Sequence, residues 1–254
     1  MEQNFQIAIP SYQRVKKLQN QTLTYLRSQS IDWSKVTIFL KDEEELLSYS
    51  KDLSGLRLVV CNTKSLAEKR SFIRRYYPAN EPILSMDDDI KNLLFLNPDL
   101  ELVPFVNRMF ALCKQEGATL WGIYPTYATN MFYNKERVAI GLQFINGCFY
   151  GFLNDPTIQY PTELFQSGQE DVWLSLYLYN RDKVVLRYEG ASPYTWNFGE
   201  GGLTEARKKY GSEIETSYRY LAEKFSSYCS FKIKKNGRPD VQFKKTKRRF
   251  ISLF

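Results

Sequence analysis

Histidine is absent from this sequence of 254 residues. Without an imidazole group the chain holds no Ser-His-Asp or Cys-His catalytic unit, no zinc site with histidine ligands and no histidine pH switch. A general base that works near neutral pH must therefore be a carboxylate, a lysine, a tyrosine or a cysteine. A metal site must be built mainly from oxygen atoms, which favours Mg²⁺ or Mn²⁺.

Cysteines and long apolar runs are also scarce. The four cysteines lie far apart without C-x-x-C spacing, which indicates buried thiols in a reducing compartment. No apolar stretch approaches the roughly 18 residues of a membrane span, and the N-terminus does not resemble a signal peptide. We therefore expect a cytoplasmic protein, in the host cytoplasm if it is viral, with no membrane span.

Positive charge is concentrated at the C-terminal end. The net charge is +7, and a hydrophobic content of 43% is enough for a folded core. Residues 228–254 carry nine cations against Asp240 alone, a net +8, which leaves −1 for residues 1–227. Apolar residues between the cations predict that this basic extension packs on the same domain. The cations are Lys232, Lys234, Lys235, Arg238, Lys244, Lys245, Lys247, Arg248 and Arg249.

Short apolar runs alternate with helical patterns over residues 1–90, which predicts βαβ units and a mostly parallel sheet. After Pro104, strand-like runs follow one another and predict a meander or a mixed part of the sheet. We expect one α/β domain over residues 1–227. The strands are expected at Gln6–Pro10, Val36–Leu40, Leu56–Cys61, Pro82–Met86, Leu120–Tyr127, Val138–Ile145, Cys148–Phe152 and Lys183–Leu186, and the helices at Val15–Ser28, Ser65–Tyr77, Phe105–Glu116, Gln169–Tyr179, Thr204–Lys209 and Glu213–Phe225.

Three adjacent carboxylates, Asp87, Asp88 and Asp89, follow the buried run Pro82–Met86. At the carboxyl end of a parallel strand they line the crevice where open α/β sheets bind ligands, and a divalent cation there relieves their repulsion. A solvated Asp-rich turn that caps the next segment is the simpler interpretation. We favour the metal site, because carboxylates placed directly on a strand end are uncommon.

An acidic pair, Glu170-Asp171, opens an apolar helix. Its simplest role is to complement the helix dipole. In a chain without histidine, a carboxylate here is also the obvious general base.

Two basic segments are candidates for phosphate contacts. Lys69 and Arg70 lie on the helix after the third strand, where they could instead pair with Glu68 at the surface. Gly201, Gly202 and the later Arg207 offer backbone N–H groups and a guanidinium to a diphosphate, although a Gly-Gly pair is more often a simple turn.

These motifs together resemble GT-A nucleotide-sugar glycosyltransferases over roughly residues 5–210. The resemblance rests on Ile9-Pro10-Ser11-Tyr12 with Arg14, on Lys69-Arg70, on the D-x-D of Asp87 and Asp89, and on Glu170-Asp171. More narrowly, "IAIPSY-R", "FLKDEEE", "KRSFI" and "SMDDDI" resemble the base J glucosyltransferase and phage TET-associated DNA glycosyltransferase group. The resemblance implies a Rossmann-like GT-A domain with a central, mostly parallel mixed sheet flanked by helices.

The resemblance also implies a role for each matching residue. Asp171 is the catalytic base and Glu170 orients the donor sugar or the base. Asp87 and Asp89 hold Mn²⁺ or Mg²⁺, with Asn197 or a water in place of the late histidine of many such enzymes. We expect the sugar pocket around Trp121, Asn146 and Gly147. The remaining UDP-sugar contacts are Pro10, Ser11, Tyr12, Arg14, Asp42, Lys69, Arg70, Asp87, Asp88, Gly201, Gly202 and Arg207.

The implied reaction is inverting transfer of a sugar, with glucose expected, from a UDP-sugar to the hydroxyl of a hydroxymethylated pyrimidine in DNA. The nine cations of the basic extension and its aromatic residues match a surface for phosphates and an extruded base. Contact with anionic lipid is the simpler use of such an extension. Two alternatives stay open: a GT-A transferase for a saccharide or cell-surface glycan, and a non-catalytic DNA-binding module. A monomer is expected.

Overall fold

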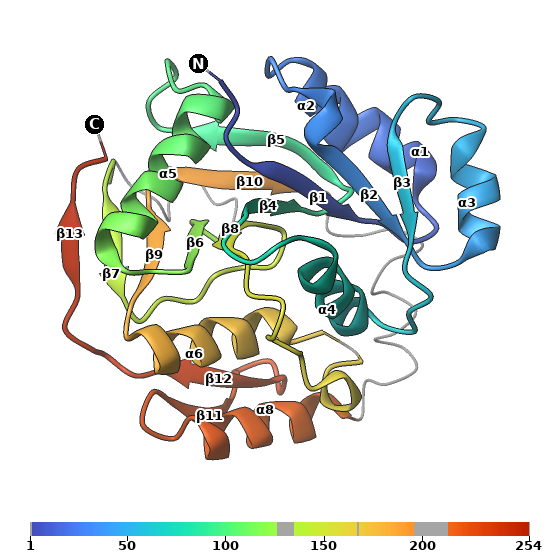
Figure 1. Cartoon of the computed structure of the whole chain (residues 1–254). Helices are drawn as coiled ribbons and strands as arrows, with labels where there is room; N and C mark the ends of the chain where they lie inside the picture. Colours follow the sequence, from blue (N-terminus) through green and yellow to red (C-terminus); the bar gives the residue numbers. More distant parts are fainter. Residues whose placement is uncertain (1, 126–134, 167, 196–212, 254) are drawn as a thin grey trace.

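A mixed β-sheet runs through the centre of the molecule (Figure 1). The computed structural model describes residues 2–125, 135–166, 168–195 and 213–253. Within these residues, nine strands pair in the order β13-β7-β9-β6-β8-β4-β1-β2-β3. The strands are β1 Gln6–Pro10, β2 Val36–Leu40, β3 Arg57–Val60, β4 Pro82–Met86, β6 Leu120–Ile123, β7 Val138–Gly141, β8 Phe149–Leu153, β9 Val185–Tyr188 and β13 Arg249–Ile251.

One half of the sheet is parallel and the other is mixed. β3, β2, β1 and β4 are parallel neighbours, so their carboxyl ends meet at one edge. β8 is antiparallel to β4 and to β6, and β9 lies parallel to β6 but antiparallel to β7. This confirms the α/β class with a mixed central sheet. The pairing is not a meander, since β6 and β7 have no ladder with each other and β9 lies between them.

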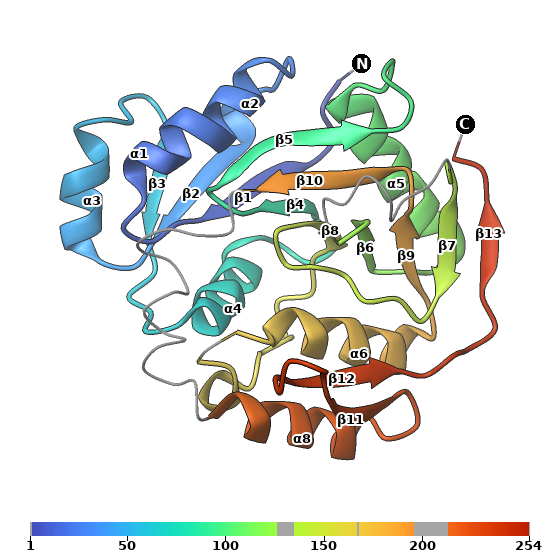
Figure 2. The same cartoon turned by 180° about the vertical axis from the view of Figure 1, so that it is seen from behind.

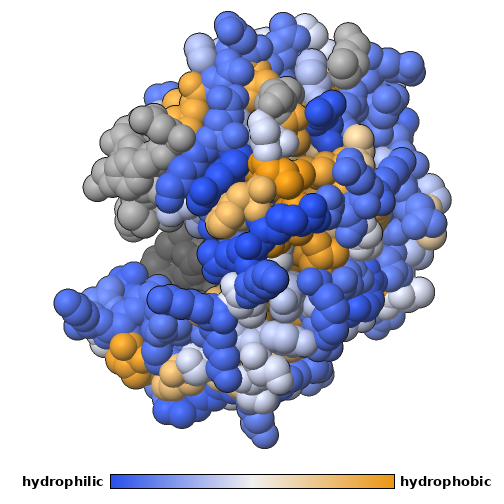
Figure 3. Space-filling model, turned by 90° about the vertical axis from the view of Figure 1, so that its left-hand side faces the viewer, coloured by the Kyte–Doolittle hydropathy of each residue, from blue (hydrophilic) through white to orange (hydrophobic). Residues whose placement is uncertain are grey.

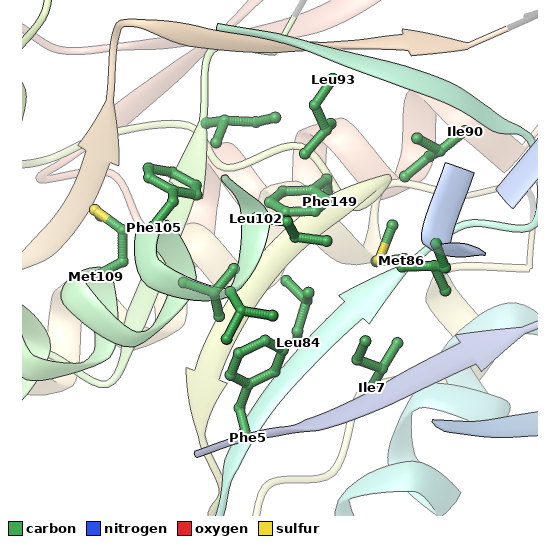
Figure 4. Close-up of a cluster of buried hydrophobic side chains, with 14 of the residues drawn as sticks. Phe5, Ile7, Leu84, Met86, Ile90, Leu93, Leu102, Phe105, Met109 and Phe149 are labelled. Atoms are coloured by element: carbon green, nitrogen blue, oxygen red, sulfur yellow. The ribbon is translucent and has the colours of Figure 1, made fainter. Parts of the chain in front are cut away.

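Helices cover both faces of the sheet (Figures 1 and 2). Side chains of α1, α2 and α5 join one buried apolar cluster, and side chains of α4, α6 and α8 join a second cluster across the sheet. Figure 4 shows the first cluster, in which Phe105 and Met109 of α5 lie over Leu84 of β4 and Phe149 of β8. The helices are α1 Val15–Leu18, η1 Gln19–Leu23, α2 Thr24–Arg27, η2 Trp33–Lys35, α3 Glu43–Ser50, α4 Leu66–Tyr76, α5 Leu102–Glu116, η3 Thr162–Leu164, α6 Glu170–Asp182 and α8 Ile214–Lys224.

Local sequence signals set most helix boundaries. The Ser65 side chain accepts a hydrogen bond from the Glu68 N–H and caps α4, and the left-handed Gly117 ends α5. α5 begins three residues before the expected Phe105, because Pro104 fits the first turn of a helix. The helix expected at Val15–Ser28 contains a π-helical turn, η1, in its middle. The helix expected at Thr204–Lys209 lies outside the described residues.

Two short sheets were not predicted from the sequence. β5 (Ile90–Phe95) pairs antiparallel with β10 (Ala191–Thr195), about a hundred residues later in the chain. β11 (Cys229–Ile233) and β12 (Pro239–Phe243) form a hairpin whose Cys229 and Val241 are buried in the second apolar cluster, together with Leu221 of α8.

The basic extension contributes to the central sheet. β13 pairs antiparallel with β7 at one end of the sheet, and Leu253 is buried in the first apolar cluster. Residues 228–253 therefore fold against the rest of the chain. A domain boundary at residue 227 stays a prediction.

The described helices include none with the length and apolarity needed to cross a membrane. All four cysteines lie in the described part of the chain, and each is a free thiol.

Candidate active site

The candidate site lies where β1, β2 and β4 end. Ser11 follows β1 and is buried; its hydroxyl donates a hydrogen bond of 2.6 Å to Asp88 Oδ2 and lies 2.8 Å from the Tyr49 hydroxyl. The Tyr49 hydroxyl also accepts the N–H of Arg14 at 2.9 Å. These contacts join the loop after β1, the helix α3 and the triple-aspartate turn after β4.

Arg14 bridges two of the three aspartates. Its Nη1 lies 3.4 Å from Asp88 Oδ1 and 3.2 Å from Asp89 Oδ2. Burial nevertheless raises the pKa of both carboxyls, and the charge of Asp88 raises the pKa of Asp89 further. The pKa of Asp87 is also raised well above its usual range, first by burial and then by its acidic neighbours. Burial therefore disfavours the ionised forms of these three carboxyls, although Arg14 and Arg70 lie beside them.

The π-helical turn η1 positions this acidic turn. Thr22 donates its hydroxyl to the carbonyl of Asp87 at 2.8 Å and accepts the N–H of Ile90 at 2.9 Å. Thr22 lies within the helix expected at Val15–Ser28, and the sequence predicted no role in the site for it. A π-helical turn often marks a functional site, and here it places a buried hydroxyl under the aspartates.

Arg70 joins the two acidic motifs. Its guanidinium lies 3.7 Å from Asp87 Oδ1 and 3.4 Å from Glu170 Oε1, so α4 connects the end of β4 to the start of α6. It also donates hydrogen bonds to the Gly147 carbonyl at 2.9 Å and to the Tyr150 hydroxyl at 3.1 Å. Arg70 and Glu170 are both buried, so the pair is a fixed part of the site.

Gly147 leaves room for this arginine. A Cβ atom there would lie 2.6 Å from Arg70 Nη2, so a side chain at this position would displace the guanidinium. The sequence indicated Gly147 only as part of a sugar pocket.

Asp171 lies beside the buried pair. Its Oδ2 accepts the Gly147 N–H at 3.2 Å and its Oδ1 accepts the Val172 N–H at 2.8 Å. Burial, and then the charge of Glu170, raises the pKa of Asp171 to about 6. A carboxyl with that pKa is ionised at neutral pH and still basic enough to accept a proton.

Lys69 of α4 and Asp42, which follows β2, lie at the β2 side of the site. The ammonium of Lys69 is buried, donates to the Ser11 carbonyl, and has a lowered pKa because of desolvation. Asp42 caps α3 by accepting the Glu45 N–H at 3.0 Å and pairs with Lys41 at 3.3 Å. Glu45, which the sequence analysis did not select, is buried and accepts N–H groups of Gln13 and Lys41 at 2.6 and 2.7 Å.

The acidic turn fits a divalent cation shared with a phosphate ligand. Among the described residues, no group of three or more acidic or cysteine side chains is arranged to hold a metal ion by itself. Mg²⁺ commonly takes only one or two protein carboxylates and completes its shell with phosphate oxygens and water. Asp87, whose side chain is about one-third exposed, and Asp89 supply such a partial set.

Some residues predicted for the site lie outside the described residues or away from the site. Asn197, Gly201, Gly202 and Arg207 lie outside the described residues. Trp121 does not line a sugar pocket, which corrects the expectation: it is fully buried and packs edge-on against Phe105 and Phe110 in the core.

Pro10 and Tyr12 lie on either side of Ser11. Tyr12 is partly exposed, and its ring centre lies 5.3 Å from the Lys41 ammonium.

Several cations of the basic extension have partners within the protein. Lys232 and Lys234 pair with Asp240 at 3.7 and 3.0 Å, and Arg249 pairs with Glu116 of α5. Lys244 donates to the Ser226 carbonyl at 2.7 Å. Within the part of the chain that the structure describes, no ion pair involves Lys235, Arg238, Lys245, Lys247 or Arg248.

Comparisons with known proteins identify the fold. No family model matches the chain, and no curated protein sequence matches it. Among solved structures, S. aureus TarS 1-349 in complex with UDP-GlcNAc aligns at 12% identity and a TM-score of 0.55 over 86% of this chain and 66% of TarS 1-349. The mannosyltransferase PcManGT from Pyrobaculum calidifontis in complex with GDP-Man and Mn²⁺ aligns at 11% identity and 0.55 over 88% and 65%.

A third match has almost the same length as this chain. Glucosyl-3-phosphoglycerate synthase from Mycobacterium tuberculosis, in complex with Mn²⁺, UDP and glucosyl-3-phosphoglycerate, aligns at 11% identity and a TM-score of 0.51 over 97% of this chain and 90% of the synthase. The chain spans slightly less than two thirds of TarS 1-349 and of the mannosyltransferase. The order of its strands and these likenesses show that the chain has the GT-A glycosyltransferase fold.

Proposed function

We propose that this chain is a metal-dependent, inverting glycosyltransferase that moves a sugar, with glucose expected, from a UDP-sugar to the hydroxyl of a hydroxymethylated pyrimidine in DNA. The observation that carries the transferase is the Arg70 bridge. It joins Asp87 after β4 to Glu170 at the start of α6, beside an Asp171 whose pKa is raised to about 6. A donor site and a base are thereby adjacent.

The donor is proposed to bind across the ends of the parallel strands. Pro10, Ser11, Tyr12, Arg14 and Asp42 form the nucleobase end. Asp88 is held between Ser11 and Arg14 and keeps that loop in place. Gly201, Gly202 and Arg207, outside the described residues, stay predicted diphosphate contacts.

The diphosphate end is assigned to Lys69, Arg70, Asp87 and Asp89. Asp87 and Asp89 would hold Mn²⁺ or Mg²⁺, which when bound supplies positive charge next to the leaving diphosphate. The bound manganese and nucleotide sugars of the similar structures support this donor and this ion.

Asp171 is proposed to take the proton from the acceptor hydroxyl as its oxygen attacks the anomeric carbon. The glycosidic bond to the diphosphate breaks on the opposite side, which inverts the anomeric centre. Two backbone N–H groups orient the Asp171 carboxylate, and its proximity to Glu170 keeps it basic. Glu170 is fixed by Arg70 and so serves to orient the site.

The acceptor is proposed from the basic extension and from the resemblance to DNA-modifying transferases. Among the described residues, six extension cations have no acidic partner, and we assign the phosphate contacts to them first: Lys235, Arg238, Lys244, Lys245, Lys247 and Arg248.

The test is a transfer assay with three sets of acceptors. The protein is incubated with Mn²⁺, a panel of UDP-sugars and DNA that contains hydroxymethylcytosine, hydroxymethyluracil or no modification, and the nucleosides are read by mass. A hexose added only to hydroxymethylated bases is expected, and Asp171→Asn should abolish transfer while calorimetry still detects UDP-sugar binding.

Three other outcomes would contradict the proposal. Transfer to a saccharide but not to DNA would favour a glycan transferase. DNA binding without any release of UDP would indicate a non-catalytic module. Near-normal transfer by Asp171→Asn would remove Asp171 as the base.

A further inference from the structure

A second group of arginines gathers on the sheet face that carries α6. Alternate residues of a strand point to opposite faces, and Leu120 of β6 and Val185 of β9 lie in the cluster with α6. By the same alternation, Tyr124 just after β6 and Arg187 of β9 belong to the α6 face. Arg137, just before β7, also belongs to this face, because Val138 packs on the other side.

The basic extension adds to the same face. Ile251 and Leu253 pack in the α5-side cluster, and Arg249 pairs with Glu116 of α5, so these residues face away from α6. Phe250 and Arg248 therefore lie on the α6 face. In agreement, a Cβ atom added at Gly141 would lie 3.7 Å from the Cγ of Arg248.

Positive charge is in excess in this group. We call Arg137, Arg187 and Arg248 the arginine cluster. Glu189 pairs with both Arg137 and Arg187, at 2.9 and 3.2 Å, and no described acidic residue pairs with Arg248. Glu136 belongs to the opposite face, next to Tyr188.

Arg187 is only partly compensated by Glu189. Its side chain is only 12% exposed, its Nε has no hydrogen-bond partner, and burial and then the charge of Arg248 lower its pKa. Buried guanidinium donors without partners favour an anion in this place.

Aromatic rings accompany the arginines. The guanidinium carbon of Arg137 lies 3.7 Å from the ring centre of Phe250, and that of Arg187 lies 5.3 Å from the ring centre of Tyr124. Phe250 is 43% exposed, which is unusual for a phenylalanine in a sheet strand. Guanidinium groups with exposed rings match a ligand that carries both phosphates and planar bases.

The cluster and the proposed base contact the same segment, residues 144–147. Arg187 donates to the Phe144 carbonyl at 3.5 Å, and three residues later the Gly147 N–H donates to Asp171. Three residues of extended chain span at most about 11 Å. Phe243 of β12 packs against Phe144 at 6.1 Å between ring centres, so the extension supports this segment too. Figure 3 shows the side of the molecule that carries β13 in Figure 1.

We propose that the arginine cluster binds a phosphodiester of a polynucleotide acceptor, with Phe250 as a platform for a neighbouring base. This deepens the proposed function and rests on it for the reaction that follows. The polynucleotide would then run over the α6 face of the sheet and present its modified base to Asp171.

The test compares neighbouring residues on opposite faces of β13. Arg248→Gln and Arg249→Gln remove the same charge, but only Arg248 belongs to the arginine cluster. Binding of a fluorescent single-stranded oligonucleotide to the full chain is measured by anisotropy over a salt series. We expect Arg248→Gln to weaken binding about fivefold at 100 mM salt and to lower the slope of log K against log salt by about 0.7, as for one lost phosphate contact. Arg249→Gln should change neither.

Equal effects of the two variants on binding would overturn the proposal, because the total charge and not the position of Arg248 would then determine binding. No effect of either variant would overturn it as well. Binding to vesicles of anionic phospholipid that depends on Arg248, without binding to the oligonucleotide, would also overturn it. Phe250→Leu should weaken single-stranded binding with an unchanged salt slope.

A separate readout distinguishes this proposal from the proposed function. Release of UDP from UDP-sugar in the absence of acceptor tests the transferase centre alone. Oligonucleotide binding that depends on Arg248, without UDP release, would support the proposed role of the arginine cluster and contradict the proposed transferase activity. UDP release without oligonucleotide binding would support the transferase activity and contradict the role of the cluster.

Discussion

At the scale of single residues, the absence of histidine makes the environment of one carboxyl decisive. Asp171 has a raised pKa because it is partly desolvated and lies next to Glu170, while Arg70 and two backbone N–H groups limit the rise. An aspartate in water is ionised well below pH 6 and is a weak base. Its environment gives Asp171 the basicity that an imidazole supplies in other proteins.

This environment predicts the pH dependence of transfer. Asp171 must be ionised to accept a proton, and a raised pKa means that it becomes protonated as the pH falls through about 6. We expect kcat/KM to fall about tenfold per pH unit below that value. The rate of UDP release measured from pH 4.5 to 8.5 checks this.

A matched aspartate provides the control for this pH profile. Asp155 pairs with Arg181 at 2.8 Å and has a lowered pKa, so Asp155→Asn should leave the profile unchanged. A profile that is flat between pH 5 and 7 in the unmodified protein would exclude Asp171 as the base.

At the scale of the element, the π-helical turn in the first helix supports the triple-aspartate turn. It places Thr22 so that one hydroxyl satisfies both the Asp87 carbonyl and the Ile90 N–H. Two hydrogen bonds of Thr22 thus connect the triple-aspartate turn to a helix that precedes it by more than sixty residues.

Thr22→Val tests this support, because valine keeps the shape of threonine and removes the hydroxyl. Leaving a buried N–H without a partner should cost about 1–3 kcal/mol in the free energy of unfolding. The displaced turn should also weaken binding of UDP in the presence of Mn²⁺. Urea unfolding and calorimetry measure the two effects.

Thr24→Val is the control in the same helix, since its hydroxyl donates to the Gln19 carbonyl at the exposed surface. A Thr22→Val protein with unchanged stability and unchanged UDP binding would show that the turn does not need this support.

At the scale of the whole molecule, the basic extension is part of the folded domain. β13 completes one end of the central sheet, and Leu253 is only 2% exposed. Deleting the extension would therefore remove core residues together with the cations, so single charge substitutions test nucleic-acid binding more cleanly than truncation.

We expect Leu253→Ala to destabilise the protein by about 2–5 kcal/mol, as for other leucines removed from a core. The apolar Ile233 is 52% exposed on β11, and Ile233→Ala should cost less than about 0.5 kcal/mol. Urea unfolding followed by circular dichroism measures both variants. Similar stabilities of the two variants would show that the C-terminal end does not contribute to the core.

The sequence predicted best where the signal is local. β1, β2 and β4 match the expected ranges to the residue, and α4 (Leu66–Tyr76) lies within the expected Ser65–Tyr77. β5 and β10 were missed because each is stabilised by a partner distant in the chain, and no local pattern marks such a pair. Trp121 was assigned to a sugar pocket, although a large aromatic residue on a central strand is usually buried.

Some residues of the candidate site could likewise be selected from the sequence, and others could not. Asp87, Asp89 and Asp171 could be selected from the sequence, because carboxylates next to apolar runs are conspicuous in a chain without histidine. Thr22, Glu45, Arg137 and Arg187 could not be selected, since threonines, glutamates and arginines at such spacings are ordinary on any helix or strand. Their roles depend on which groups they meet after folding.

By itself, therefore, the sequence determined the chemical groups available, which are carboxylates after a strand and at a helix start and a basic C-terminal end, and from them it predicted a metal site and a base. Only the tertiary structure decided that Arg70 joins the two acidic motifs, and that Arg248 lies near Arg187 while Arg249 pairs with Glu116 of α5. The physical reason is that residue type and local spacing set what a side chain can do. The pairing of strands distant in the chain sets which side chains meet, and on which face of the sheet.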